Sequence, residues 1–171
     1  MVIRKENMMT VFLDLETQHL FDDFVGGQKD KNNYNKLKIA IAGTLGDGVY
    51  LTWEESQILQ LIEYLRKFDC IVGHNLFNFD YRIIGSYFQY PESKLGTRSA
   101  GIICNTFDTM QEFSHIVNAA SGEDVSWVGL DDICIRNFGM SKQLDGKLIP
   151  KLWRDGEIGI VQNYLLQDLK M

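Results

Sequence analysis

The stretch Met9-Thr-Val-Phe-Leu-Asp14 decides the fold, because its apolar run ends on an acidic residue. A short apolar run bounded by polar residues predicts a buried strand. Glu16 follows two positions after Asp14, and side chains at i and i+2 share one face of a strand. Two carboxylates at the end of such a strand are costly unless they are paired or bind a metal. The pair alone leaves two interpretations open, a functional site and a solvated strand end that leads into a turn.

Further strands and helices are expected on the C-terminal side of this strand. Apolar runs and turn residues predict strands at 38–44, 49–52, 70–73 and 101–107. Helical periodicity predicts helices at 54–68, 80–90, 108–117, 129–138 and 157–171. Polar and glycine-containing stretches predict loops at 26–36, 119–127 and 141–150. Three strands in a meander, followed by alternating strands and helices, predict an α/β fold with a mixed central sheet of about five strands flanked by helices. Residues 1–171 are expected to form a single domain.

Composition narrows the classes of protein. The formal net charge of −6 argues against binding duplex DNA through a bulk positive field, but it does not exclude a nuclease, because carboxylates that bind Mg²⁺ lower the net charge. Cys70, Cys104 and Cys134 are far apart among apolar residues, which favours reduced core thiols over a zinc site or a disulfide. No apolar run reaches membrane-spanning length and the start of the chain is polar, so we expect a cytoplasmic protein with no membrane contact.

A second acidic position follows the strand expected at 70–73. Asp80 opens the next predicted helix, and ligands collect at such strand-to-helix crossings in α/β sheets. An ordinary N-cap also explains Asp80, although a cap does not require Asn75 and Phe79 before it. His74 in the same loop is expected to be held by a hydrogen bond rather than to bind a metal.

The third acidic position lies on the last predicted helix. Tyr164 and Asp168 stand four residues apart, so the phenol and the carboxylate lie on the same face of the helix, at the margin of an apolar stripe. A tyrosine at the core edge beside a solvated acid would give the same pattern. Only three residues follow Asp168, and we expect a frayed last turn to loosen it. Asp155 and Glu157 repeat the Asp-x-Glu spacing, but they open a helix. Acidic side chains are common there because they interact favourably with the helix dipole.

Taken together, the three motifs resemble those of the DEDD family of 3′–5′ exonucleases, in the ribonuclease H-like superfamily. That family, which includes proofreading domains of DNA polymerases, carries Asp-x-Glu, then Asn-x-x-x-Phe/Tyr-Asp, then Tyr-x-x-x-Asp or His-x-x-x-Asp. The chain has them in this order as Asp14-Leu-Glu16, Asn75-Leu-Phe-Asn-Phe79-Asp80 and Tyr164-Leu-Leu-Gln-Asp168. The tyrosine at 164 matches the tyrosine subclass. The stretch 145–153 is similar to predicted exonucleases related to B-family polymerase proofreading domains.

This resemblance implies a function and a set of site residues. Four acids would hold two Mg²⁺ or Mn²⁺ ions for phosphodiester hydrolysis: Asp14, Glu16, Asp80 and Asp168. Tyr164 would orient the attacking water, and Thr17 and Asn75 would contact the terminal nucleotide or support the acids. The expected substrate is the 3′ end of single-stranded DNA or RNA, from which nucleoside 5′-monophosphates are released. Three lysines near the third motif are candidates for phosphate contacts: Lys142, Lys147 and Lys151.

Other classes of protein stay open at this point. A non-catalytic nucleic-acid-binding or scaffold module that keeps the fold would show the acids bonded to basic partners. A ribonuclease H-type endonuclease arranges its carboxylates differently, and a small-molecule phosphohydrolase predicts a closed pocket. The choice between DNA and RNA, the oligomeric state and a helicase or polymerase partner are not determined by the sequence.

Overall fold

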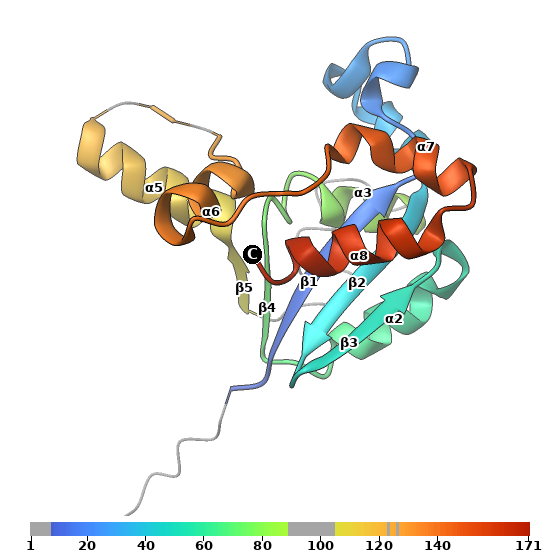
Figure 1. Cartoon of the computed structure of the whole chain (residues 1–171), viewed down its shortest axis with the longest axis horizontal. Helices are drawn as coiled ribbons and strands as arrows, with labels where there is room; N and C mark the ends of the chain where they lie inside the picture. The colour runs from blue at the N-terminus through green and yellow to red at the C-terminus, as the bar shows by residue number, and fades with distance from the viewer. Residues whose placement is uncertain (1–7, 89–104, 123, 126) are drawn as a thin grey trace, which may run out of the picture.

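The protein is built around one central β-sheet (Figure 1). The computed structural model describes residues 8–88, 105–122, 124–125 and 127–171. Five strands form the sheet in the order β3-β2-β1-β4-β5: β1 (Thr10–Thr17), β2 (Ile39–Gly46), β3 (Val49–Trp53), β4 (Cys70–Gly73) and β5 (Asn105–Asp108). β1 pairs antiparallel with β2, and β2 with β3, whereas β1–β4 and β4–β5 are parallel. The predicted mixed five-stranded sheet is therefore confirmed.

Helices cover both faces of this sheet. The described α-helices are α1 (Tyr34–Leu37), α2 (Ile58–Leu65), α3 (Asp80–Ser86), α5 (Thr109–Ser121), α6 (Leu130–Phe138), α7 (Ile149–Arg154) and α8 (Ile158–Asp168). Short 3₁₀ helices add η1 (Phe21–Asp23), η2 (Gly27–Lys29), η3 (Lys31–Asn33), η4 (Glu55–Gln57) and η5 (Gly146–Leu148). α8 lies across β1 and β2 on one face, while α5 and α6 stand beyond the β5 edge (Figure 1). None of the helices in the described ranges is long and apolar enough to cross a membrane.

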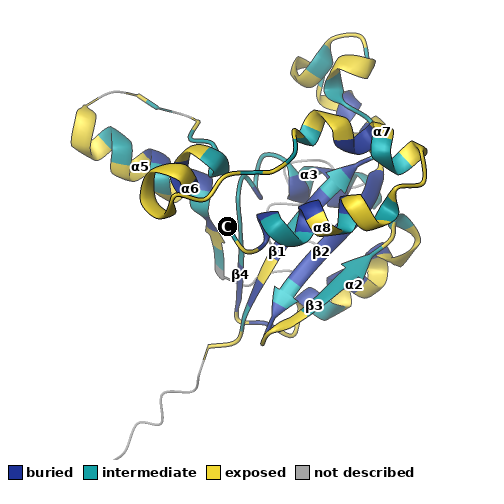
Figure 2. Ribbon diagram, in the orientation of Figure 1, coloured by how far each residue is buried: buried dark blue, intermediate teal, exposed yellow. Residues whose placement is uncertain are grey.

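Alternation along β1 separates two different environments. Its odd-numbered positions Val11, Leu13 and Leu15 are buried in the larger core, with residues of α1, α2 and α3 (Figure 2). Its even-numbered positions Asp14 and Glu16 face the other side, where α7 and α8 pack. The smaller core on that side contains Ile41, Ile149, Val161, Tyr164 and Leu165. The period of two places the acids opposite the larger core, as expected for a strand.

Most element predictions are confirmed, and the exceptions have local causes. The predicted loop at 26–36 contains η2, η3 and α1, because side chains supply the hydrogen bonds of these short turns. Asp30 accepts from the Asn32 backbone at 3.0 Å, and buried Asn33 donates to the Val25 and Gly27 carbonyls at 3.1 and 2.8 Å. Composition marks such a segment as polar and does not reveal that its turns are folded.

Several boundaries also differ from the sequence prediction, and β1 continues past Asp14 to Thr17, so the acids lie within the strand rather than at its end. α5 continues past 117 to Ser121 and ends where Gly122 adopts a left-handed conformation with φ of 72°, so the predicted loop at 119–127 begins too early. The predicted loop at 141–150 includes η5 and the first two residues of α7. α3 ends at Ser86 rather than near 90. Residues 89–90 of that helix, residues 101–104 of the predicted fifth strand and Cys104 lie outside the described residues, whereas Cys70 and Cys134 are buried free thiols as expected.

One glycine brings the sheet and α8 together. Gly43 on β2 lies directly opposite Asp14 on β1. A Cβ atom at Gly43 would stand 2.9 Å from side-chain carbons of both Leu165 and Leu169. The absent side chain therefore allows α8 to pack closely on the strand next to the acids.

Replacing Gly43 by alanine is expected to destabilise the protein. The added methyl group overpacks the interface with α8, which typically costs about 1–3 kcal/mol. Chemical denaturation measures this change in the free energy of unfolding. Gly159→Ala is the matched control, because nothing lies within 4 Å of that position near the start of α8. The control should be stabilised by about 0.5–1 kcal/mol; equal behaviour of the two variants would contradict the close approach.

Candidate metal centre

Three carboxylates from two elements converge on the face of the sheet that α8 covers. Asp14 and Glu16 extend from β1, and Asp168 extends from the end of α8. Each offers an oxygen atom, and these oxygens lie within 4.8 Å of one another. Asp168 is buried, with 8% of its surface exposed, and Asp14 and Glu16 are partly buried. The structure thus brings three of the four predicted acids into one group that could hold a metal ion.

Asp80 lies beside this group but does not belong to it. It is the first residue of α3 and is 1% exposed. Neither of its carboxylate oxygens has a hydrogen-bond partner among the described residues. Burial, and then the nearby Asp14 carboxylate, raise the pKa of Asp80 well above its ordinary value. Asp80 is therefore a buried acid that feels the charge of the group.

Burial and mutual repulsion dominate the electrostatics of the site. Burial, reinforced by Asp168, raises the pKa of Asp14 to about 7. The pKa of Glu16 is raised well above its ordinary value by burial and by the Asp14 and Asp168 charges. Such shifts show that the folded chain resists placing full negative charge on all of these acids at once.

The oxygens left without partners fit a divalent cation. Asp14 Oδ2 and Asp168 Oδ1, as well as both oxygens of Asp80, are buried without a hydrogen bond in the described structure. Buried polar atoms usually have partners, so a concentration of unpartnered acceptors points to a missing positive group. Hard carboxylate oxygens are the ligands that Mg²⁺ and Mn²⁺ prefer. The donor set is therefore suited to such an ion.

Lys142 provides one positive charge next to the acids. Its ammonium group forms an ion pair with Asp168 Oδ2 and donates to the Tyr164 hydroxyl at 3.0 Å. Burial alone would lower the pKa of Lys142, but Asp168 and Tyr164 raise it above its ordinary value. The sequence offered Lys142 as a phosphate contact, whereas the structure uses it to pair with an acid of the cluster. Lys147 and Lys151 are exposed.

This ion pair bears on the non-catalytic alternative. A metal-free module was expected to show its acids bonded to basic partners, and Asp168 has such a partner in Lys142. Asp14 Oδ2, however, has no hydrogen-bond partner in the described part of the chain, nor has either oxygen of Asp80. One lysine therefore offsets only part of the acidic charge.

Tyr164 and Asp168 are firmly packed. Tyr164 is 5% exposed, and its hydroxyl is held by Lys142. The next residue, Leu169, is 6% exposed, and its backbone N–H donates to the Leu165 carbonyl at 3.1 Å. The Met171 carbonyl accepts from Cys134 Sγ at 3.2 Å. The last turn is therefore docked against α6, and the expected fraying at Asp168 is not observed.

The two expected substrate contacts lie in different settings. Thr17 is 7% exposed, and its hydroxyl donates to the His19 carbonyl at 2.7 Å, so it stabilises the turn after β1. Asn75 adopts a left-handed backbone conformation with φ of 65°. Its side-chain oxygen is buried without a partner in the described residues. Asn75 therefore has a free acceptor, whereas the Thr17 proton is already used.

Asp108 is a buried acid whose contacts the sequence did not reveal. This acid, 2% exposed, ends β5 and caps α5. It also accepts hydrogen bonds from the backbone of the loop that carries Asn75. The capping signal at the start of the predicted helix was visible in the sequence, but no local pattern indicates a contact with that loop.

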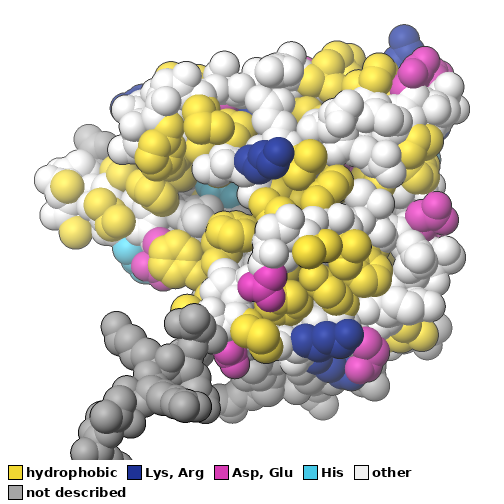
Figure 3. Space-filling view, turned by 60° about the horizontal axis from the view of Figure 1, so that its bottom comes forward, with side chains coloured by type: hydrophobic (Ala, Val, Ile, Leu, Met, Phe, Trp, Pro, Cys, Tyr) yellow, Lys and Arg dark blue, Asp and Glu magenta, His cyan; other side chains and the backbone are white. Residues whose placement is uncertain are grey.

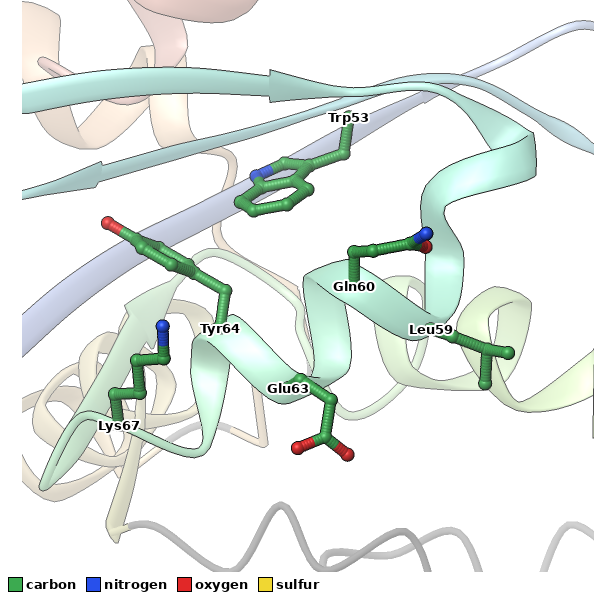
Figure 4. A pocket seen from close by; sticks show the side chains of 6 residues that line it. All are labelled: Trp53, Leu59, Gln60, Glu63, Tyr64 and Lys67. Atoms are coloured by element: carbon green, nitrogen blue, oxygen red, sulfur yellow. The ribbon is translucent and has the colours of Figure 1, made fainter.

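A hollow on the opposite face of the sheet is separate from the acids. It lies between the end of β3 and α2 (Figure 4), and its lining consists of Trp53, Leu59, Gln60, Glu63, Tyr64 and Lys67. Trp53 packs against the larger core, away from the face that bears Asp14. This hollow does not contribute to the candidate metal centre.

Comparison with known proteins supports the fold. No protein-family model and no curated protein sequence matches this chain. Among solved structures, the chain is similar to the family B DNA polymerase from the hyperthermophilic archaeon Pyrobaculum calidifontis, with a TM-score of 0.63 and 14% sequence identity. The match covers 95% of this chain and 23% of the polymerase chain. At this identity the likeness shows the fold alone, an α/β architecture consistent with a ribonuclease H-like fold.

The acids predict a distinctive pH dependence in the absence of metal. Asp14 has an ordinary pKa of 3.8 and a pKa of about 7 in the folded chain. Between these values the folded chain keeps a proton that the unfolded chain has released, so the free energy of unfolding falls as the pH rises. Urea unfolding in excess EDTA should show this fall.

Two comparisons test the origin of that slope. Asp14→Asn should make it shallower, because an amide does not titrate, and saturating Mn²⁺ should oppose the loss of stability at the upper end of the range. A metal-free stability that stays flat or rises across the same pH range would contradict the raised pKa of Asp14 that burial and the Asp168 charge produce.

Proposed function

We propose that this protein is a metal-dependent 3′–5′ exonuclease that releases nucleoside 5′-monophosphates from the 3′ ends of single-stranded nucleic acid. The observation that carries the proposal is the convergence of Asp14, Glu16 and Asp168 within 4.8 Å, beside the buried hydroxyl of Tyr164. The first and third sequence motifs supply these residues, and the second motif supplies Asp80, which is buried beside them. The similarity in fold to a chain that is a DNA polymerase gives further support.

The acids would divide the work of holding two divalent ions. Asp14, Glu16 and Asp168 would hold one ion, and Asp14 and Asp80 the other. Ions held by these acids would supply activation of the attacking water and stabilisation of the negative charge on the leaving 3′ oxygen. The raised pKa of Asp14, about 7, means that the site loads most readily when this proton has left.

Tyr164 would position the water instead of deprotonating it. Burial raises the pKa of its hydroxyl above the ordinary value, so the group keeps its proton at neutral pH. A proton-bearing hydroxyl is a poor general base but a good hydrogen-bonding group. Lys142 fixes its direction through the 3.0 Å contact between Nζ and the hydroxyl oxygen.

The surface charge is consistent with a site that binds a strand end and not a long duplex. The net charge is −6, and the face in Figure 3 shows hydrophobic patches with scattered charged groups rather than a broad basic field. Affinity for a backbone would therefore come mainly from the bound ions and a few local groups. Asn75, whose side-chain oxygen is buried without a partner in the described structure, would support the acids or meet the terminal nucleotide.

A stepwise ladder of products tests the proposed activity. We expect 5′-labelled DNA or RNA oligonucleotides to shorten from the 3′ end in Mg²⁺ or Mn²⁺, but not in EDTA. Asp14→Ala should reduce the cleavage rate more than about a hundredfold. Loss of a residue that only supports a metal ligand typically costs up to about that much, and this variant removes a ligand itself. Asp155→Ala is the matched control, because Asp155 belongs to the second Asp-x-Glu pair, which lies outside the proposed centre, and is exposed.

Three results would count against the exonuclease. Internal cuts only would indicate an endonuclease, and activity that survives Asp14→Ala would exclude the proposed centre. Metal-dependent binding of oligonucleotides without any hydrolysis would favour the non-catalytic module.

Replacing Tyr164 by phenylalanine separates orientation from packing. Losing a hydrogen bond to a polarised water should cost about 1.5–3 kcal/mol of transition-state stabilisation, or about ten- to a hundredfold in rate. Single-turnover cleavage at saturating metal measures this loss, and the ring itself should keep α8 packed. Tyr64→Phe, on the opposite face of the sheet, should cleave at the wild-type rate. Full activity of Tyr164→Phe would rule out a role for the hydroxyl.

A further inference from the structure

The loop that joins β4 to α3 contains one residue of the proposed site, leads directly into another, and is held from the neighbouring strand. This loop, residues 74–79, carries Asn75 and ends at Asp80. Asp108 stands at the end of β5, paired with Gly73 at the end of β4. Its carboxylate accepts from the Asn75 backbone N–H at 2.8 Å through Oδ1 and from the Phe77 N–H at 3.1 Å through Oδ2. A third donor, the Met110 N–H, lies 3.1 Å from Oδ1.

Thr109 adds a second attachment to the same loop. Its hydroxyl donates to the Gly73 carbonyl at 3.2 Å and contacts His74 Nδ1 at 2.9 Å. The two neighbouring residues therefore bind four of the five positions from the end of β4 into the loop: Gly73, His74, Asn75 and Phe77. A carboxylate that is 2% exposed and accepts three N–H groups forms strong, charge-assisted hydrogen bonds.

The conformation of Asn75 explains why such an attachment is needed. Its φ of 65° is unusual for a residue other than glycine. The N–H of Asn75 is held by Asp108, and its carbonyl accepts from the Phe79 N–H at 3.0 Å. Asp80 follows directly after Phe79. Fixing the Asn75 backbone thus orients its unpartnered side-chain oxygen and sets the position at which Asp80 enters α3.

We propose that Asp108, assisted by Thr109, is a positioning residue that holds the Asn75–Asp80 loop in the geometry required for cleavage. The inference rests on the proposed exonuclease function and deepens it. Asp108 acts through the loop, since its oxygens are directed to backbone N–H groups. Because misplacement of reacting groups by about 1 Å can cost about a hundredfold in rate, a released loop should impair cleavage strongly.

Asp108→Asn tests the attachment at a single atom. The amide can keep one oxygen toward Asn75 and Met110, but its NH₂ group would then face the Phe77 N–H, donor against donor. Hydrogen exchange followed by NMR should show faster exchange at the Phe77 amide, with the central strands unchanged. Single-turnover cleavage should fall about a hundredfold. Asp30→Asn is the matched control. Asp30 also caps a helix, the short η3, through the Asn32 N–H at 3.0 Å, but it lies outside the site. This variant should cleave at the wild-type rate.

A second pair of variants covers the case in which Asp108→Asn does not fold. Thr109→Val removes the hydroxyl at nearly constant volume, and Thr109→Ser keeps it. The proposal expects cleavage to fall in Thr109→Val and to be rescued in Thr109→Ser at equal melting temperatures. If Thr109 has a purely structural role, Thr109→Val should lower the melting temperature and the cleavage rate together. That result would overturn the positioning proposal.

The outcomes separate this proposal from the proposed function. If the wild-type chain cleaves no oligonucleotide, the exonuclease proposal fails, while exchange at the loop amides still shows whether Asp108 holds them. If the wild-type chain cleaves and Asp108→Asn cleaves equally well with a released Phe77 amide, the positioning role is wrong. Unchanged protection of both loop amides would overturn it as well.

Discussion

The burial of several carboxylates in one place is the constraint on which the site depends. Asp14, Glu16 and Asp168 share a space in which their oxygens lie within 4.8 Å, and Asp80 is buried beside them. Folding alone does not favour this arrangement, since burial raises the pKa of each of these acids, and neighbouring acids of the group add to it for Asp14, Glu16 and Asp80. The central sheet and the two cores must therefore supply the stability that the acids remove. A fold that spends stability at one place in this way is typical of functional sites.

Each layer of the structure has a separate part in holding that arrangement. The larger core fixes β1 through Val11, Leu13 and Leu15, which leaves the alternate positions free to be acidic. The smaller core docks α8 and thereby delivers Tyr164 and Asp168. Lys142, anchored by its backbone N–H to Asp131 at 2.7 Å, brings compensating charge from outside both cores. The site is thus assembled from elements whose own packing does not require it.

Local patterns in the sequence predict those features of the structure that follow the regular spacing of side chains along a strand or a helix. The alternation in β1 predicts the shared face of Asp14 and Glu16, and the i, i+4 spacing predicts that of Tyr164 and Asp168. Contacts between distant segments have no such signature. Asp108 and Asn75 are 33 residues apart, and Lys142 and Asp168 are 26 apart, so neither pairing could be predicted. The folded turns within 26–36 were also missed, because side-chain hydrogen bonds, rather than apolar residues, hold them together.

The missing side chain at Gly43 has a consequence for the choice of acid at position 168. With bare backbone beneath Leu165 and Leu169, α8 lies close enough for the short side chain of aspartate to reach the β1 acids. Aspartate has one rotatable bond fewer than glutamate, so less side-chain entropy is lost when it is fixed in place. A more distant helix would need the longer and more mobile acid. The close spacing between β2 and α8 therefore allows a short and less mobile side chain to supply the carboxylate at position 168.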